Sequence, residues 1–371
     1  MKKRNSLFLI FVLIVITSMA AYAFNWKFWE KRETQAAERP ASAEAQIPET
    51  TADFEILPTM NSLSDAKNQV WVGTFQLVWN DLVNELVKHP IEFVGYKSVM
   101  AENLNRQDFT TEDISENSYY KKWGLASPEL KSEIEAGIKE KFNETSDILD
   151  MFDWNPEPEK YFLYAMLKKD FQYIARFDKL EDAEFKGSAG LVKYFGIDKN
   201  SSEALRHTVH VLYYNNPNDF ALTLRSKQGD TIYLYRTDDN KPLSGLYADM
   251  RAKTESYGGS RRLSKKDEFK APNIEFKSER EFPELYNKPI KNSGFIISKA
   301  VETVQFKMDE AGVELKSEAA MMQEKAMVAN LHNTKPRYFY FNSRYIIFIQ
   351  EDGKTKPYFA MKIEDAKKLQ K

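Results

Sequence analysis

Two histidines are the first residues in this sequence whose type and spacing could do chemistry. His207 and His210 are three positions apart, and on a helix this spacing would bring two imidazoles to adjacent turns, where they could bind zinc. The surrounding stretch RHTVHVLYY is rich in β-branched and aromatic residues and favours a strand, in which positions three apart face opposite sides. We therefore expect surface histidines and no metal site.

Other motifs give little support for catalysis. The stretch SYGGSRR, Ser256 to Arg262, could form an anion-binding loop, but no helix signal follows it and we interpret it as a plain loop. The sequence has no G-x-S-x-G, no phosphate loop and no dinucleotide fingerprint. Carboxylates are plentiful, so a paired-carboxylate hydrolase stays open as the least supported alternative. We predict that the chain is not an enzyme and binds no cofactor.

Composition sets further bounds on the class of protein. The 371 residues are 42% hydrophobic and 13% aromatic, which is enough for a large core. Cysteine is absent, which excludes disulfides, a thiol nucleophile and a thiolate metal site. The net charge is -2 and the charged residues are interspersed, so we expect no nucleic acid partner.

The N-terminal region has the pattern of an export signal. Basic residues at positions 2–4 precede the apolar run LFLIFVLIVITSMA and the small-residue pattern Ala21-Tyr22-Ala23, so residues 1–23 are predicted to be a signal peptide. The alternative is an uncleaved membrane anchor, which would be the protein's sole contact with a membrane. Residues 24–60 are predicted to be a flexible linker, with the folded part beginning near Leu63 and one domain spanning 61–371. Either way, we expect a secreted, periplasmic or cell-surface protein.

Hydrophobic spacing predicts helices first and strands later. One apolar stripe predicts a helix that ends at Pro90, and a second helix is predicted to begin at Ser127, with Pro128 in its first turn. The residues of the two stripes are Trp71, Phe75, Trp79, Leu82 and Leu86, followed by Leu130, Ile134, Ile138 and Phe142. From Tyr161 onward, the sequence predicts strands, including hairpins that turn at residues 228–230 and 351–354. This order predicts an α+β fold.

The stretch FKMDEAGVELKSEAAMM, Phe306 to Met322, changes its alternation halfway. Val304, Phe306 and Met308 share one strand face, whereas the less polar residues after Gly312 have the opposite parity. A glycine at the corner permits such a reversal. The residues after it also suit a helix, because alanine, leucine, methionine, glutamate and lysine dominate, and this alternative stays open.

Four phrases of the sequence resemble the serpin family, over roughly residues 161–363. The resemblance rests on SKAVETVQFKMDEAGVELKSEAA, YFNSRYIIFIQEDGKTKPYFAMKI, DEFKAPNIEFKSEREFPELYNKPI and LYAMLKKDFQYIARFDKLEDAEF. The first is similar to the family's central strand, its Glu-x-Gly corner and its reactive-loop hinge, and the second to its closing hairpin. The third is similar to a strand followed by a helix that carries Leu285, and the last has the spaced phenylalanines Phe177 and Phe185.

The resemblance implies a serpin-like α+β fold, with a helical N-terminal half packed on large, mainly antiparallel sheets and an exposed reactive-loop-like segment near the C-terminus. It implies a protease inhibitor that offers a loop to a serine or cysteine protease and inserts it as a strand. By this resemblance the hinge comprises Glu310, Gly312, Val313, Leu315 and Ser317, and the bait bond lies at Lys325, Ala326 or Met327. The alternative is a non-inhibitory binding or structural protein at the cell surface, because Leu315 and Lys316 are bulky for a hinge.

Overall fold

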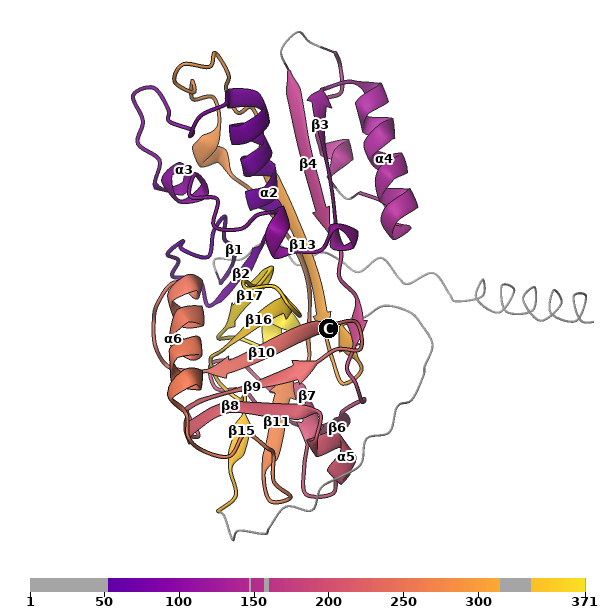
Figure 1. Cartoon of the computed structure of the whole chain (residues 1–371), viewed down its shortest axis with the longest axis vertical. Helices are drawn as coiled ribbons and strands as arrows, with labels where there is room; N and C mark the ends of the chain where they lie inside the picture. The colour runs from indigo at the N-terminus through magenta and orange to yellow at the C-terminus, as the bar shows by residue number, and fades with distance from the viewer. Residues whose placement is uncertain (1–52, 147, 157–159, 314–334, 371) are drawn as a thin grey trace, which may run out of the picture. The chain divides into compact units, whose positions relative to one another are not determined.

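The computed structural model describes residues 53–146, 148–156, 160–313 and 335–370, which lie within one compact unit, Pro48–Lys371 (Figure 1). Its largest sheet has seven strands in the order β1-β2-β17-β16-β10-β9-β8. In that order the strands are Phe54–Ile56, Asn68–Val72, Phe359–Ile363, Tyr345–Glu351, Asp230–Arg236, Asp219–Arg225 and Val209–Asn216. The pair β1 and β2 is parallel, and the other neighbours are antiparallel.

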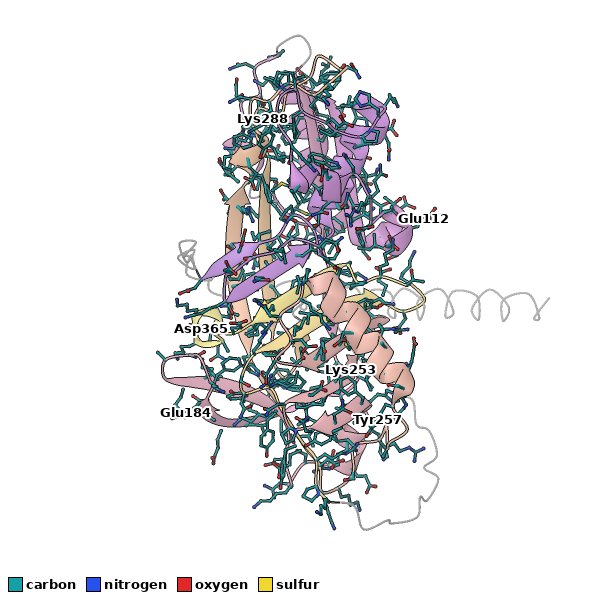
Figure 2. The ribbon with its side chains drawn as sticks, turned by 90° about the vertical axis from the view of Figure 1, so that its left-hand side faces the viewer. Glu112, Glu184, Lys253, Tyr257, Lys288 and Asp365 are labelled. Atoms are coloured by element: carbon teal, nitrogen blue, oxygen red, sulfur yellow. The ribbon has the colours of Figure 1, made fainter. Side chains whose placement is uncertain are left out.

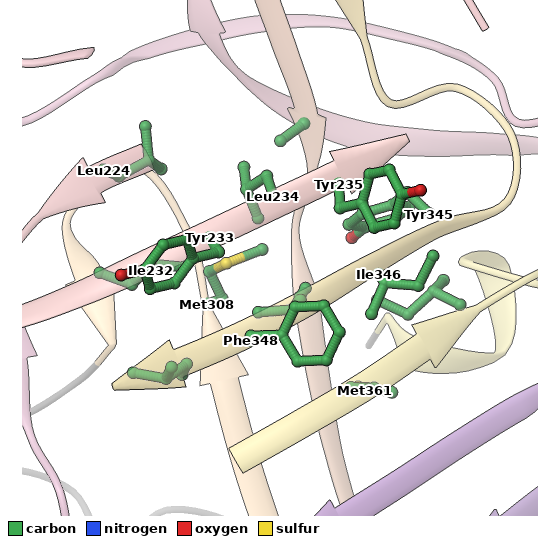
Figure 3. Packing of buried hydrophobic residues seen from close by; sticks show 14 of the residues in the cluster. Leu224, Ile232, Tyr233, Leu234, Tyr235, Met308, Tyr345, Ile346, Phe348 and Met361 are labelled. Carbon is green, nitrogen blue, oxygen red and sulfur yellow. The ribbon is translucent and has the colours of Figure 1, made fainter. Parts of the chain in front are cut away.

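The central strands of this sheet are covered on both faces. Every residue of β2, β10, β16 and β17 is buried, which explains why these segments are long apolar runs rather than alternating ones. Figure 3 shows Met308, from another sheet, among side chains of β10, β16 and β17, and all of them belong to one core cluster. The helix α6 (Leu243–Ser256) packs against β8 and β17, and its Lys253, labelled in Figure 2, bonds Asp219 of β9 at 3.0 Å.

A second sheet has four strands in the order β15-β11-β7-β6. These strands are Tyr338–Tyr340, Glu268–Pro272, Leu191–Ile197 and Asp178–Glu184. The strand β15 pairs with β11 in parallel, while the other two pairs are antiparallel. After the segment that the sequence prediction assigns to the reactive loop, the chain therefore continues as β15 in this sheet.

Three two-stranded ladders complete the sheets in the described part of the chain. The β3–β4 ribbon joins Tyr119–Leu125 to Tyr161–Leu167, and the β12–β13 ribbon joins Ile274–Glu281 to Val301–Met308. The third ladder is short and joins β5 (Phe171–Gln172) to β14 (Gly312–Val313). All three ladders are antiparallel.

Three α-helices lie in the described part of the N-terminal half. They are α2 (Thr74–Asp81), which continues as a π-helical segment (Leu82–Val87), α3 (Val99–Leu104) and α4 (Pro128–Phe142), whereas the short α5 (Glu203–Arg206) comes further on, before α6. The prediction for α4 is confirmed, because the Ser127 side chain accepts a hydrogen bond from the Leu130 amide and Pro128 opens the first turn. Gly137 has a packing role, since a Cβ there would lie 2.5 Å from the Tyr120 ring of the β3–β4 ribbon.

Two boundaries differ from the sequence prediction. Trp71 lies in β2 opposite Ala360, and the helix begins only at Thr74. The four-residue spacing of Trp71 and Phe75 matches a helix by coincidence, while the valines beside Trp71 favour a strand. Strand β1 lies within the range predicted to be a linker, and its Ile56 is 1% exposed, so the folded part begins before Leu63. The α+β class and both predicted hairpins are confirmed.

Lys169 joins the end of β4 to the largest sheet through buried ion pairs. Its Nζ lies 3.0 Å from Asp230 Oδ1 and 2.6 Å from Glu351 Oε1, and these two carboxylate side chains are 1% and 8% exposed. Ser118 donates a further hydrogen bond to Glu351 at 2.7 Å. Burial raises the pKa of Asp230 even though Lys169 opposes this shift. The lysine is therefore a shared cationic partner for two carboxylates that have little access to water.

We expect Lys169→Met to destabilise the protein by about 3–5 kcal/mol, because it leaves buried carboxylates unpaired. The neighbouring substitution Lys168→Met is the control, since its partners Glu144 and Asp170 are 43% and 22% exposed. It should cost about 1 kcal/mol or less. Urea unfolding at neutral pH measures both variants, and equal losses would contradict the assignment.

Candidate functional site

The corner after β13 reverses the chain within four residues. The Asp309 amide donates to the Gly312 carbonyl at 3.1 Å, and the Ala311 amide donates to Asp309 Oδ1 at 2.8 Å. Gly312 has φ = +140°, and a Cβ there would lie 2.4 Å from the Phe171 carbonyl oxygen. Both the backbone angle and the close approach therefore require glycine.

Strand β14, which begins at this corner, lies between two chain segments. On one side it pairs antiparallel with β5, with Gly312 opposite Gln172 and Val313 opposite Phe171. On the other side Gly312 forms an antiparallel bridge with Asp309, the residue that follows β13. Because β5 follows β4 in the chain, the start of β14 lies between the continuations of β4 and β13.

The strands β4 and β13 run in the same direction without pairing. Near the start of β4, the Tyr161 ring lies 5.7 Å from that of Phe295, six residues before β13, and Lys299 Nζ lies 3.3 Å from the Met151 carbonyl oxygen. At their far ends β5 and β14 are paired. Among the described residues, each strand has one partner, β3 or β12, and no ladder joins β4 to β13. We call the two unpaired edges of β4 and β13 the open seam.

Helix α2 connects the two ribbons behind the open seam. It packs against β4, and the Thr74 hydroxyl at its start donates to Glu302 Oε1 of β13 at 2.6 Å. At its last residue, Asp81 Oδ1 lies 2.5 Å from Lys121 Nζ of β3. Helix α2 therefore bridges the β3–β4 ribbon and the β12–β13 ribbon, which no ladder joins among the described residues.

Glu310 fixes the corner to the segment that follows β5. Its carboxylate lies 2.6 Å from Arg176 and 3.2 Å from Lys179, and its carbonyl accepts a hydrogen bond from the Phe177 amide at 2.9 Å. Burial raises the pKa of this carboxyl, but the hydrogen bonds from Arg176 and Lys179 outweigh burial, so the pKa is lowered. Glu310 is therefore a charged anchor beside the start of β14.

Arg337 anchors the chain where it returns toward β15. Its guanidinium bonds Asp267 Oδ2 at 2.8 Å, the Ser260 carbonyl at 2.8 Å and the Arg262 carbonyl at 2.6 Å. After Ser256, which ends α6, the stretch SYGGSRR is thus a loop, as predicted. Two of its backbone carbonyls accept hydrogen bonds from the Arg337 guanidinium. Residues 314–334 are therefore bounded by two well-bonded ends, the corner at Gly312 and Arg337.

The structure brings together part of the predicted hinge. Glu310, Gly312 and the backbone of Val313 meet residues 171–179 at one end of the open seam. The other predicted hinge residues, Leu315 and Ser317, and the predicted bait residues Lys325, Ala326 and Met327 lie outside the described residues.

The histidines are on the surface, as predicted. His210 is exposed on β8, whereas His207 follows α5 rather than lying in a strand, because Ser202 caps a short helix there. In the described part of the chain, no group of three or more histidine, aspartate or glutamate side chains is arranged to bind a metal ion. No helix in that part has both the length and the apolar character needed to span a membrane.

The sequence prediction missed several residues of the site. Arg176 and Lys179 stand more than a hundred positions from their partner Glu310, and no local pattern marks such pairs. Glu302 left a readable signal, since it is an acid with the same strand parity as the buried Val304 and Phe306. The role of Thr74 as the first residue of α2 was missed, because the spacing of Trp71 predicted a helix that starts earlier.

The arrangement of sheets is similar to that of serpins of known structure. AtSerpin1 from Arabidopsis, in its native stressed conformation, matches with a TM-score of 0.51 and 13% identity over 83% of this chain and 93% of that chain. Serpin48 from the insect Tenebrio molitor gives a TM-score of 0.43 and 14% identity over 77% of this chain and 94% of that chain. A complex of thyroxine-binding globulin with thyroxine gives 0.41 and 13%, with 63% of this chain covering 64% of that chain.

The sequence itself matches no protein-family model and no curated protein. The structural match to AtSerpin1 nevertheless covers most of both chains. This chain therefore has a divergent serpin-like fold, and the resemblance seen in the sequence is confirmed at the level of the fold.

We expect Gly312→Ala to destabilise the protein by about 2–3 kcal/mol, because it adds a backbone clash to the strain of a positive φ angle. Gly353→Ala is the control: Gly353 has φ = +81°, and a Cβ at this position would meet no atom of the described residues within 4 Å, so it carries strain alone. This variant should cost about 1 kcal/mol. Thermal unfolding compares the two, and a larger loss for Gly353→Ala would contradict the close approach at the corner.

Proposed function

We propose that this chain is an inhibitor of a serine or cysteine protease, which cleaves the segment after Val313 as bait. The cleaved segment then inserts into the open seam as a new strand between β4 and β13. The position of β14 carries this proposal, because its first residue, Gly312, already lies between the continuations of the two strands and is paired antiparallel with both.

Insertion has a clear physical driving force. A strand that continued from β14 would add a ladder to each of the two edges of β4 and β13 that belong to no ladder among the described residues. A strand as long as β4, which has seven residues, would take up residues 314–320. Each new hydrogen bond contributes on the order of 1 kcal/mol net, so two completed ladders give a gain of the same order as the entropy lost in ordering a short segment, and burial of one strand face adds to the gain.

The anchors at both ends support the bait role. The predicted bait residues Lys325, Ala326 and Met327 lie between the corner at Gly312 and Arg337, which is bonded to Asp267. A cut among them releases the part after Val313 while Arg337 stays bound. If the protease nucleophile forms an ester or thioester with the new C-terminal carbonyl, and the following residue leaves as the free amine, insertion carries the enzyme along.

We also propose that the protein is exported and acts outside the cytoplasm, on the basis of the signal-like residues 1–23. Expression of the full chain with a C-terminal tag, followed by cell fractionation, tests this. We expect the tagged protein in the secreted, periplasmic or surface fraction, and N-terminal sequencing decides between cleavage after Ala23 and an uncleaved anchor. Recovery in the cytoplasm alone would contradict export.

The experiment for insertion is a melting comparison of intact and nicked protein. We expect a nick within residues 314–334 to raise the melting temperature by on the order of 10 °C or more, because the new strand completes both ladders. Ser317→Arg should abolish this gain, since the parity after Gly312 turns residue 317 toward the buried face of the inserted strand. Glu318→Arg is the matched control, because residue 318 has the opposite parity and should leave the gain intact.

Two outcomes would contradict the proposed inhibitor. One is a nicked protein that melts at the same or a lower temperature than the intact protein. The other is an equal gain in both arginine variants, which would show that the segment does not enter as a strand in this register. The first result would favour the alternative, a non-inhibitory binding or structural protein that uses the serpin-like fold as a scaffold, and the second would overturn the register in which the strand is proposed to insert.

A further inference from the structure

One face of the β3–β4 ribbon exposes aromatic and aliphatic side chains near the start of β4. Leu125 pairs with Tyr161, and Trp123 has the same strand parity, so the three side chains share a face. The rings of Trp123 and Tyr161 lie 6.5 Å apart. The opposite face, which carries Phe162 and Tyr164, is buried in a cluster with α4. Helix α4 therefore covers one side of the ribbon and leaves the other side to solvent.

Two loops, residues 92–97 and 286–297, extend this apolar face. The Phe295 ring lies 5.7 Å from the Tyr161 ring, and the next residue, Ile296, forms an antiparallel bridge with Pro289. The Pro289 carbonyl accepts a hydrogen bond from the Val94 amide at 2.9 Å, which joins the two loops. The exposed members of this surface, which we call the apolar patch, are Val94, Tyr96, Trp123, Leu125, Tyr161 and Ile296.

Each loop turns at a glycine that faces open space. Gly95 has φ = +68° and Gly294 has φ = +75°, and a Cβ at either position would meet no atom of the described residues within 4 Å. Val94 and Ile296, which lie beside these turns, are 58% and 54% exposed. Figure 2 shows Lys288, from the second loop, near one end of the ribbon. The loops therefore present aliphatic side chains at their tips.

The charged residues of the two loops are mostly lysines. The loops contain three lysines, one glutamate and no arginine. The Lys288 ammonium lies 4.7 Å from the centroid of the Tyr96 ring and forms no ion pair within the described part of the chain. The Lys97 side chain is 80% exposed although its ammonium lies 3.4 Å from Glu102 on α3. These ammonium groups are therefore available to anions in solution.

This composition is typical of a surface that contacts lipid. Tryptophan and tyrosine are enriched where a membrane meets water, and lysine can bury its stem while its ammonium reaches the headgroups. Exposed aliphatic tips add apolar area that the acyl boundary can bury. A protein partner would favour arginine, because lysine is depleted from protein–protein interfaces. The patch therefore fits a membrane surface better than a second protein.

We propose that the apolar patch docks on the surface of an anionic lipid membrane. The aliphatic tips enter the acyl boundary, the aromatic rings lie at the level of the headgroups, and the lysines face the lipid phosphates. This contact is separate from residues 1–23, to which the sequence prediction confined any membrane contact, and it does not depend on strand insertion. Because β14 lies beyond the far end of β4, which alone spans about 20 Å, the docked protein presents the corner at Gly312 away from the lipid.

The experiment uses the absence of cysteine from the chain. The full chain with Ile296→Cys carries an environment-sensitive dye and is mixed with vesicles of phosphatidylcholine that contain about one third phosphatidylglycerol. We expect the dye emission to shift to the blue and to be quenched by brominated acyl chains. A dye at Leu191→Cys is the matched control, because Leu191 is 53% exposed and pairs with Glu184, which Figure 2 shows at the other end of the ribbon from Lys288.

The two labels separate the patch from the N-terminal segment. If residues 1–23 bring the protein to the vesicles, they do so in both labelled variants, so quenching at position 296 and not at position 191 reports docking of the patch. Val94→Asp should lower the ratio of docked to undocked label at position 296 about tenfold, because the patch then loses a buried apolar side chain. Leu191→Asp should leave this ratio unchanged, and the melting temperature shows that both variants are folded.

Three results would overturn the lipid contact. The first is a dye at position 296 that stays in water in the presence of vesicles, and the second is equal quenching at positions 296 and 191. The third is a blue shift at position 296 that appears without vesicles as the protein concentration rises, which would show that a second copy of the chain covers the patch. All these measurements use intact protein, so their outcome is independent of whether the segment after Val313 inserts.

Discussion

The rest of the structure depends on the requirement that backbone amides and carbonyls find hydrogen-bond partners. Within the described residues, β4 pairs only with β3 and β13 only with β12, so the two ribbons face each other with ladder groups unused. Helix α2 holds them through Thr74 at one end and Asp81 at the other. The corner at Gly312 places the start of β14 at one end of the open seam. The proposed mechanism depends only on the difference in free energy between the open seam and a seam that a new strand has filled.

The same need for hydrogen-bond partners bears on the segment after Val313, whose composition suits a helix but which could also pair as a strand. A helix would satisfy its own backbone, whereas a strand in the seam would satisfy its own backbone and also pair with the edges of β4 and β13 that join no ladder in the described part of the chain. The choice between these states is therefore set by the partner surface, which the local sequence does not contain. The anchors formed by Glu310 and Arg337 fix where that segment leaves and re-enters the folded unit.

The sequence predicted elements well where one residue pattern decides the structure. Ser127 and Pro128 defined the start of α4, and the glycine turns defined the two hairpins. It failed where tertiary pairing decides, as for Trp71, whose strand partner Ala360 is almost three hundred residues away. The ion pairs of Glu310 and the unpaired seam are also products of long-range packing, so neither could be read from local spacing. Glu302 shows that a lone acid at buried parity is itself a sequence signal.

The most direct measurement is hydrogen exchange of β4 and β13 in intact and nicked protein at neutral pH, with β16 as an internal reference for a strand paired on both edges. The account predicts that the alternate amides of residues 161–167 and 301–308 that face the seam exchange rapidly in intact protein. They should become as protected as those of β16 after the nick. Protection that is already complete in the intact protein, or that does not change on nicking, would contradict the open seam and the insertion that depends on it.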